Sequence, residues 1–403
     1  MRKSFEIALV SATILLASCG GGDASQDTIS SGDDTVAVAP APTPTPTETP
    51  APTPTPLPTE TGTKGPAGYV QLAAIESNFD STGMLEGVRI PGSAAPDVVG
   101  AFRFTCKPSH NAYDDPIVFP GQPGRAHLHT FFGNTLTNAN STYASLRTSG
   151  ESTCGNELNR SAYWIPAMMN GEGQVIMPSY ISIYYKRLPQ LSDVCTTDAK
   201  CIPLPRGLRY VFGRTMDGLS GYKGHFKCLG SGTKYDTIPE VAANCEADGQ
   251  IGGVLNAPQC WNGTDLDSSD HRSHMSYKKR DRMTGQAACP ETHPYEVPEF
   301  TLGVWYDVDE TLDRSGDMST DLKTWYFASD RVEGKPAHVA GSTFHADWFG
   351  AWDDDVLKKW TDHCIDKMLN CSMGNLGNGQ MLKRNELTVK DTPRVVAAPP
   401  RII

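Results

Sequence analysis

The sequence predicts a mainly β protein, with a single disulfide-rich domain of the β-sandwich or jelly-roll type, long loops and a few peripheral helices. Its apolar and alternating runs are short, as they are in β-strands. Glycine and proline are frequent and scattered, which favours many turns. Ten of the eleven cysteines lie beyond residue 100, and an even number in an exported chain is typical of disulfides.

Five short segments are expected to be strands, because each is apolar or alternates between apolar and polar residues. They are residues 99–104, 127–131, 179–185, 208–212 and 300–306. Residues 353–369 are expected to form a helix, since apolar side chains recur at every fourth residue. Acidic residues lie at its beginning, where the helix dipole favours anions. The apolar positions are Val356, Trp360, Cys364 and Met368.

Residues 1–18 resemble a bacterial lipoprotein signal peptide. Arg2 and Lys3 precede an apolar stretch that is too short to span a bilayer and that ends in small residues. Residues 16–19, Leu-Ala-Ser-Cys, resemble the lipobox, in which the cysteine is acylated and becomes the new N-terminus. An ordinary signal peptide with an incidental cysteine is the alternative. The lipobox predicts lipidation at Cys19 and location in the bacterial cell envelope. Because glycine rather than aspartate follows Cys19, we expect the outer membrane.

Residues 19–65 are expected to form a stalk between the lipid and the domain. This segment is rich in Ser and Asp and then in Pro and Thr, and alternating proline cannot join a helix or a sheet. At about 3 Å per residue, twenty residues would reach roughly 60 Å. Binding of a proline-recognising partner is the weaker interpretation. Residues 66–403 then form one globular domain, since no second linker and no internal repeat follows.

The cysteines beyond Cys19 are expected to form up to five disulfides. No Cys-x-x-Cys motif is present, so neither a zinc knuckle nor a thioredoxin-type site is indicated. Cys195 and Cys201 are close enough in sequence to pair, as are Cys364 and Cys371, but spacing leaves the connectivity open. The ten residues are Cys106, Cys154, Cys195, Cys201, Cys228, Cys245, Cys260, Cys289, Cys364 and Cys371.

The net charge of −11 disfavours nucleic acid as a partner, because phosphates need a basic surface. It equally disfavours adhesion to an anionic membrane through protein charge, so membrane contact is expected only through the lipid at Cys19. A neutral or cationic ligand, or a metal, agrees better with this charge.

Histidine is the residue type that marks the candidate site. His127 and His129 are separated by one residue, so on a strand both side chains would lie on one face. Such a pair can bind a metal, act as an acid/base couple, or form hydrogen bonds in the core. Asp115 lies nearby in the sequence and strengthens the case for an active site.

Two further clusters combine histidine, aspartate and aromatic residues. Aromatic faces beside carboxylates suit a sugar-binding cleft, where rings stack on the sugar and carboxylates bind its hydroxyl groups. Trp261 and Trp348 could instead be core residues. The members of the second cluster are Trp261, His271 and His274, and those of the third are His345, Asp347 and Trp348.

Several motifs between about residues 102 and 355 resemble the DUF1996 family, a domain of unknown function that is mostly fungal and often secreted. The motifs begin at Asp115-Pro116, His127-Leu128-His129, Asn159-Arg160, Cys260-Trp261, Asp270-His271 and Cys289-Pro290. The resemblance implies a secreted domain but no established reaction. The lipobox, the stalk and the stretch 109–111 depart from the usual fungal pattern. The positions it carries over as site candidates are Asp115, His127, His129, Trp164, His271, His274 and His345.

Two functions agree with these observations. The first is an enzyme, a hydrolase or lyase, that cleaves an extracellular polysaccharide through His and Asp acid/base groups, with Trp164, Trp261, Asp347 and Trp348 binding substrate. The second is a non-catalytic cell-surface protein that binds glycan or metal. We expect the candidate histidines and Asp115 to converge on one pocket. The cofactor is either none or a divalent metal at His127 and His129, and acid/base chemistry is favoured because no cysteine or Glu-rich motif completes a standard metal set.

Overall fold

The structure is a computed structural model that describes residues 60–402, except 77–83, 96–98, 198, 219–222, 281–284, 286, 385, 389 and 390. The signal segment, Cys19 and residues 19–59 of the expected stalk lie outside the described residues. Residues 60–65, also assigned to the stalk from sequence, join the folded unit. Strand β1 (Thr63–Lys64) pairs with β2 (Val70–Gln71), and the carboxylate of Glu60 lies 3.0 Å from the guanidinium of Arg209.

The described chain is mainly β, as predicted, and its two largest sheets have six and five strands. The six-stranded sheet contains, in order, β13 (Gly224–Cys228), β14 (Gln250–Asn256), β20 (Glu299–Asp307), β10 (Tyr180–Arg187), β4 (Gly100–Cys106) and β23 (Asn370–Cys371). The five-stranded sheet contains β12 (Arg209–Gly213), β22 (His345–Phe349), β7 (Ala162–Pro166), β6 (His129–Gly133) and β5 (Pro108–Ala112). All five predicted strands are confirmed, with small shifts at their ends.

Smaller elements surround these sheets. One four-stranded sheet contains, in order, β11 (Lys200–Cys201), β19 (Tyr295–Glu296), β15 (Cys260–Trp261) and β16 (Met275–Ser276). A second contains β21 (Tyr326–Phe327), β8 (Met168–Met169), β9 (Gln174–Ile176) and β25 (Val395–Ala397). Two short pairs are β17 (Lys279–Arg280) with β18 (Ala287–Ala288) and β24 (Met381–Leu382) with β3 (Met84–Leu85). The helices are α1 (Tyr143–Thr148), α2 (Asp193–Thr197), α3 (Ile238–Ala242), α4 (Asp354–Trp360), the π-helix η1 (Thr361–Ile365) and the 3-10 helix η2 (Glu386–Thr388). In the described part of the chain, no helix has the length and apolar character that a bilayer crossing requires.

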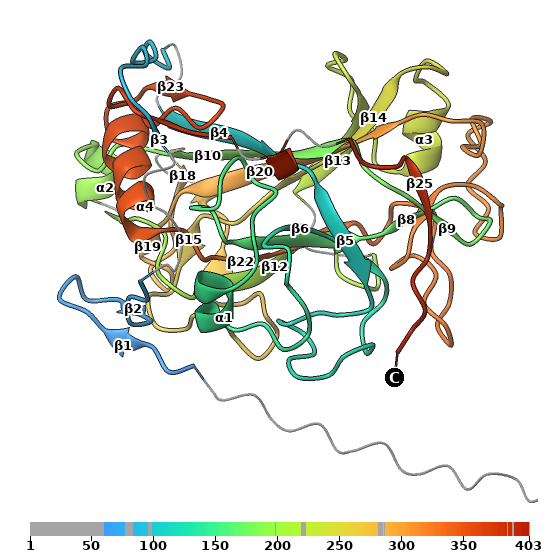
Figure 1. Cartoon of the computed structure of the whole chain (residues 1–403), viewed down its shortest axis with the longest axis horizontal. Coiled ribbons are helices and arrows are strands. Elements are labelled where there is room, and N and C mark those ends of the chain that lie inside the picture. Colours follow the sequence, from blue (N-terminus) through green and yellow to red (C-terminus); the bar gives the residue numbers. More distant parts are fainter. Residues whose placement is uncertain are drawn as a thin grey trace, which may run out of the picture. The chain divides into compact units, whose positions relative to one another are not determined.

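The two large sheets pack face to face as a β-sandwich (Figure 1). Between them, the hydroxyl oxygens of Tyr163 on β7 and Tyr185 on β10 lie 2.9 Å apart. The rings of Phe300 on β20 and Trp348 on β22 pack at a centroid distance of 5.6 Å. Because neighbouring residues of a strand point to opposite faces, Trp164 and Asp347, which are paired across β7 and β22, lie on the other face of the five-stranded sheet. That outer face carries the candidate site.

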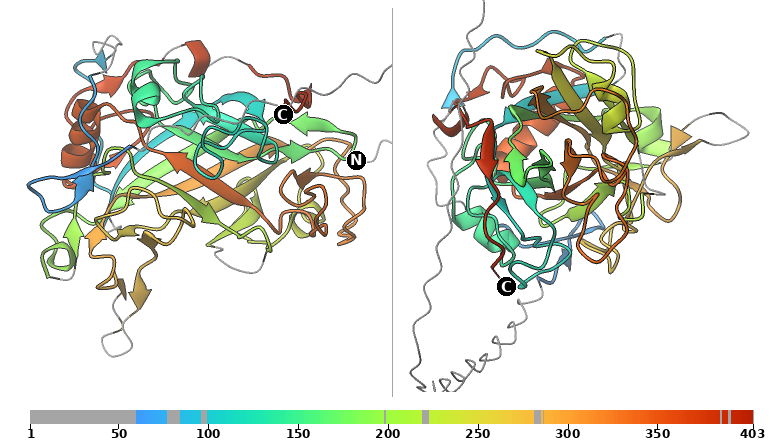
Figure 2. Two further views of the ribbon diagram at one scale, coloured as in Figure 1. Left: turned by 90° about the horizontal axis from the view of Figure 1, so that it is seen from below. Right: turned by 90° about the vertical axis from the view of Figure 1, so that its right-hand side faces the viewer.

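The predicted helix of residues 353–369 is shorter than expected. Asp353 caps α4 through its side chain, and the π-helix η1 continues to Ile365 at one end of the sandwich (Figure 2). Met368 does not share the buried face of Trp360: its backbone has φ 51° and it is 40% exposed. The chain turns there because β23 must pair with β4 and Cys371 with Cys364.

All ten cysteines of the domain are paired, so the prediction of five disulfides is confirmed. Both local pairs that spacing allowed are present. The complete set is Cys106–Cys154, Cys195–Cys201, Cys228–Cys245, Cys260–Cys289 and Cys364–Cys371.

Candidate functional site

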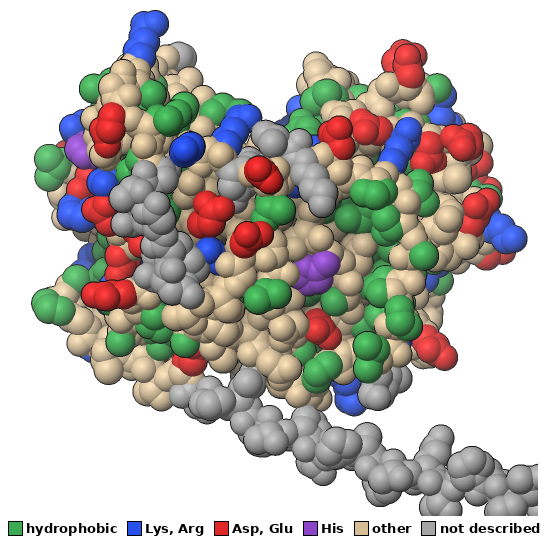
Figure 3. All heavy atoms as spheres, in the orientation of Figure 1, with side chains coloured by type: hydrophobic (Ala, Val, Ile, Leu, Met, Phe, Trp, Pro, Cys, Tyr) green, Lys and Arg blue, Asp and Glu red, His purple; other side chains and the backbone are tan. Residues whose placement is uncertain are grey.

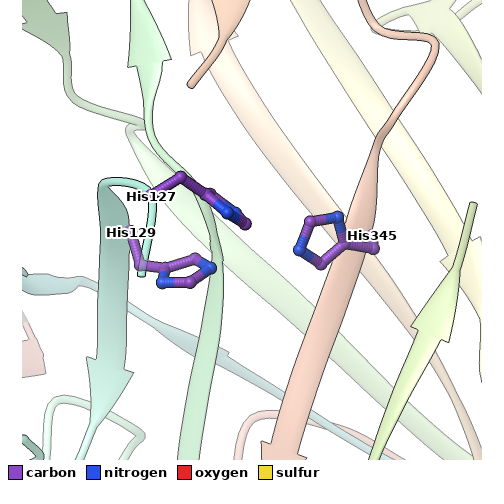
Figure 4. Close-up of side chains that lie close together, drawn as sticks. All are labelled: His127, His129 and His345. Carbon is purple, nitrogen blue, oxygen red and sulfur yellow. The ribbon is translucent and has the colours of Figure 1, made fainter. Parts of the chain in front are cut away.

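Three histidines from two separate parts of the chain meet on the outer face of the five-stranded sheet (Figure 4). His129 is the first residue of β6, His345 is the first residue of β22, and His127 lies just before β6 rather than within a strand. The ring of His127 lies 4.2 Å from that of His129 and 5.2 Å from that of His345, between centroids. Each imidazole offers one nitrogen, and these three nitrogens lie within 4.8 Å of one another.

Backbone carbonyls fix the orientation of two of these rings. The Nδ1–H of His129 donates to the carbonyl oxygen of Asp114 at 2.9 Å, and the Nδ1–H of His345 donates to that of Thr343 at 2.7 Å. Because a carbonyl only accepts, the proton is on Nδ1 and the lone pair is on Nε2 in both rings. A metal-binding histidine is held in this way by its second nitrogen.

The Nε2 atoms of His127 and His129 are buried and have no hydrogen-bond partner among the described residues. Burial lowers the pKa of His129 to about 3 and that of His345 to about 4, and in His129 the neighbouring His345 adds to the effect. Burial, with the other two histidines, also holds the pKa of His127 well below its usual value. All three rings are therefore neutral at physiological pH, which is the form that binds metal.

Two carboxylates adjoin the histidines. Asp347 lies two residues after His345 on β22, so both face the same side, and its Oδ2 is 3.9 Å from the Nε2 of His345. The side chain of Asp347 is only 1% exposed, and neither of its carboxylate oxygens has a hydrogen-bond partner in the described structure. Burial raises its pKa well above the usual value, and the nearby Asp115 raises it further. A buried carboxyl group without partners is costly unless it is protonated or meets a cation.

Asp115 is also buried, but its environment is more polar. Its Oδ1 accepts hydrogen bonds from the backbone N–H groups of Ile117 and Val118, both at 2.9 Å. Burial nevertheless raises its pKa to about 6. One oxygen each of Asp115 and Asp347 and one nitrogen of His129 lie within 4.8 Å of one another, so His129 is shared between the histidine cluster and the carboxylate pair.

A cavity of about 710 Å³ opens onto this cluster. Its lining includes His127, His345, Asp115 and Asp347, whereas His129 is fully buried behind them. The volume lies in the range of small-ligand sites. Metal ligands at the base of such a cavity would be within reach of a bound substrate.

His271 borders the same cavity and is hydrogen-bonded to Asp267. Its Nδ1 lies 2.9 Å from Oδ1 of Asp267, which raises the pKa of the imidazole above its usual value. The backbone of His271 has φ 58°, a left-handed conformation that a histidine adopts at an energetic cost, and its carbonyl accepts from the N–H of Val211 at 2.9 Å. A hydrogen-bonded pair of histidine and aspartate is therefore present at the cavity, but its carboxylate belongs to Asp267 and not, as the sequence had suggested, to Asp115.

His274 does not join the other candidate histidines. Its Nδ1 lies 2.8 Å from the hydroxyl oxygen of Ser268, and its Nε2 lies 2.9 Å from the carbonyl oxygen of Arg209. Both nitrogens are therefore occupied, and the residue is buried away from the cavity. His274 holds the 268–274 loop against β12.

The three tryptophans expected to bind sugar are core residues. Trp164, Trp261 and Trp348 are each 0% exposed, so none offers a ring face to a ligand. Trp164 stacks on Phe131, with centroids 5.5 Å apart. The indole N–H of Trp261 donates to the carbonyl of Asp265 at 2.7 Å. Half-buried Tyr113 and Tyr326 line the cavity instead, along with basic side chains that the sequence patterns did not single out.

Asp267 and Arg401 are among the residues at the site that sequence reasoning missed. Asp267 could have been found from its spacing of four residues from His271, which suits a hydrogen-bonded pair in one turn of chain. Arg401 gave no such signal, since it reaches the cavity from the C-terminal segment that follows β25.

Comparison with protein families matches residues 115–352 to a family described as "Domain of unknown function (DUF1996)". The matched region includes the histidine cluster, Asp115, Asp347 and the Asp267–His271 pair, and excludes Arg401. No curated protein and no solved structure matches the chain.

Proposed function

The chain belongs to the DUF1996 family, and we propose that it is a divalent-metal-dependent enzyme that cleaves an extracellular polysaccharide. The observation that carries the proposal is a cluster of three imidazole nitrogens, two of which have no hydrogen-bond partner among the described residues. His127, His129 and His345 present three neutral nitrogens within 4.8 Å of one another, at the base of a cavity. Asp347 adjoins them, with its Oδ2 3.9 Å from the Nε2 of His345, so its carboxylate would place a negative charge beside the cation. Three imidazoles suit a first-row divalent ion such as Zn²⁺ and leave its fourth position open for water or substrate.

The donor set has a specific reason to hold a cation. Two buried nitrogens and both oxygens of Asp347 lack hydrogen bonds within the described residues, and a cation would satisfy them together. The backbone carbonyls of Asp114 and Thr343 set the orientation of the His129 and His345 rings, so the fold itself positions two of the three ligands. This observation makes metal binding a better proposal than the purely acid/base site that the sequence favoured.

Catalysis is proposed because an acid/base group faces the same cavity. A bound divalent ion would act as a Lewis acid that polarises a substrate oxygen or activates water. His271, held by Asp267 at 2.9 Å, can accept or donate the proton that cleavage of a glycosidic chain requires. A passive metal-binding protein has no need of this pair, which is why we place the enzyme before the non-catalytic alternative.

The first test is metal content and cleavage measured on the same preparation of the full chain. We expect about one Zn²⁺ per chain by elemental mass spectrometry, and release of reducing ends from at least one member of a polysaccharide panel. Chelation should stop the release, and Zn²⁺ should restore it. Chelation acts on the wild-type protein, so this arm does not depend on the folding of a variant.

The second test uses His129→Ala, with His225→Ala on the edge strand β13 as the matched control. His129→Ala should lose metal and cleavage together, while His225→Ala should keep both. Circular dichroism should verify that each variant is folded. A metal-free protein that cleaves polysaccharide at the full rate would overturn the metal-dependent mechanism. Stoichiometric metal without cleavage of any polysaccharide would favour the metal-binding surface protein instead.

A further inference from the structure

The cavity has a cationic lining in a chain that is acidic as a whole. Five basic side chains line it, although the net charge of the chain is −11. None of the five forms an ion pair with an acidic side chain among the described residues, whereas basic residues elsewhere in the fold do. On the face seen in Figure 3, acidic and basic side chains are interspersed. The basic residues of the cavity are Arg125, Arg272, Arg331, Lys335 and Arg401.

The acidic residues of the cavity do not balance this charge. Asp115 and Asp347 are buried beside the histidines and belong to the proposed metal site. Asp270 is engaged by its own loop: its Oδ1 accepts from the backbone N–H groups of Arg272 and Ser273 and from two serine hydroxyls. Glu333 is the remaining acidic side chain of the lining and is exposed. A divalent ion would make the local potential still more positive.

Several of the basic groups are held in place. The guanidinium of Arg331 lies 4.0 Å from the ring centroid of Tyr326, and that of Arg401 lies 5.3 Å from the ring centroid of Tyr113. The Nε–H of Arg401 also donates to the carbonyl of Gly124 at 2.8 Å. The Nε of Arg331 is buried and has no partner within the described residues. Fixed guanidinium groups lose little conformational entropy when they bind an oxyanion.

We propose that the substrate is an acidic polysaccharide, whose carboxylate or sulfate groups are bound by these basic side chains. The inference rests on the proposed function, because it takes this cavity as the binding site of the glycan. A cleft lined by one sign of charge concentrates its field and attracts ligands of the opposite sign. Arginine suits planar, two-point recognition of carboxylate and sulfate oxygens. The charge of the cavity, and not the net charge of the chain, determines which ligand binds. We therefore propose an anionic ligand in place of the neutral or cationic ligand expected from net charge.

Two matched pairs of polysaccharides test the proposal. Polygalacturonate and its methyl ester differ in the carboxylate, and dextran sulfate and dextran differ in the sulfate ester. Binding to the metal-loaded full chain should be at least about tenfold tighter for the charged member of one pair, and it should weaken as salt is added. The pair that shows the difference identifies which anionic group is recognised.

Variants connect the effect to the cavity. Lys335→Gln combined with Arg125→Gln removes two exposed charges and should weaken binding of the charged polymer by about three- to tenfold. Lys279→Gln on β17, outside the cavity, is the control and should bind like the wild type. If the protein binds the charged and the neutral polysaccharide of each pair equally well, the inference is wrong. If it also cleaves a neutral polysaccharide, the proposed function is still supported. Tight binding of an acidic polymer that the metal-loaded protein cannot cleave would support the inference and oppose the function.

Discussion

His129 donates its Nδ1–H to the backbone carbonyl of Asp114 at 2.9 Å, and this contact directs its Nε2 toward the other two histidines. Asp114 is itself anchored through its side chain. Its Oδ1 accepts from the N–H of Gly124 at 2.9 Å and its Oδ2 from the N–H of Ala139 at 3.1 Å. Asp114 therefore connects its own loop with those of Gly124 and Ala139, and these contacts together position the carbonyl that orients His129.

Asp114→Ala should weaken Zn²⁺ binding by about 10–100-fold without removing a ligand, because loss of an outer contact misaligns the ring. The measurement is competition with a chromogenic chelator. Asp114→Asn retains one acceptor and should recover part of the affinity, which a general effect of instability would not explain. Unchanged affinity in Asp114→Ala would mean that the carbonyl is positioned by other contacts.

The Asp267–His271 pair predicts a pH-dependent contribution to stability. The hydrogen bond to Asp267 raises the pKa of His271 above its usual value, with support from the charges of Asp115 and Asp270 and opposition from burial. When a group has a higher pKa in the folded protein than in the unfolded chain, it stabilises the folded state. This stabilisation is complete at pH values below the unfolded-state pKa and is lost as the pH rises through the folded-state pKa. Asp267→Asn should therefore lower the free energy of unfolding more at mildly acidic than at alkaline pH.

Two measurements check this prediction. Urea unfolding of the wild type and of Asp267→Asn at the two pH values gives the loss of unfolding free energy at each pH. The variant also loses the Arg209–Asp267 ion pair, but that loss is the same at both pH values and cancels when they are compared. An NMR titration should show the pKa of His271 falling in Asp267→Asn. An unchanged titration would show that Asp267 does not control the imidazole.

The strands could be predicted because their apolar patterns are local properties of the sequence. The predicted helix was too long because its periodicity continues beyond Ile365, whereas the disulfide of Cys364 and the pairing of β23 turn the chain. These constraints are long-range or covalent and leave no trace in the periodicity. The same holds for disulfide connectivity, of which spacing indicated only the two local pairs.

The candidate site was predictable in its residue types but not in its arrangement. His127, His129, His271 and His345 do converge around one cavity, while His274, which belongs to the same motif as His271, points into loop contacts. Pattern alone cannot separate these cases, because both are polar residues in aromatic surroundings. The prediction that the tryptophans bind sugar was wrong for the same reason. A tryptophan next to an acidic residue gives the same sequence pattern whether its ring lies in the core or in a cleft.

Lipid anchoring at Cys19, which lies outside the described residues, is predicted from the lipobox. Cys19→Ala should release the protein from the membrane fraction or leave its signal peptide uncleaved, because the acylated thiol is lost. Fractionation and immunoblotting of cells that express each form provide the measurement. Normal cleavage with normal membrane retention of the variant would contradict the anchor.

The disulfides should differ in their contribution to stability according to the loop each closes. Cys106 and Cys154 are 48 residues apart, and Cys195 and Cys201 are 6 apart. Chain entropy predicts a loss of about 4 kcal/mol when the first pair is replaced by alanine and about 2 kcal/mol for the second. Chemical denaturation of the two double variants compares them, and alkylation of unreduced wild-type protein should label none of the ten cysteines. A larger loss for the short loop would contradict the entropic explanation.

Trp261 should contribute to stability and not to ligand binding. Its ring is 0% exposed and packs on Tyr69 and Tyr295 at centroid distances of 5.9 and 6.0 Å, and its N–H donates to Asp265. Trp261→Ala should therefore cost about 3–5 kcal/mol of unfolding free energy through the cavity it leaves. The exposed Leu191, changed to alanine, is the control and should stay within about 0.5 kcal/mol of the wild type. The affinity of folded Trp261→Ala for acidic polysaccharide should equal that of the wild type. Weakened binding with full stability would instead place this indole on the glycan surface.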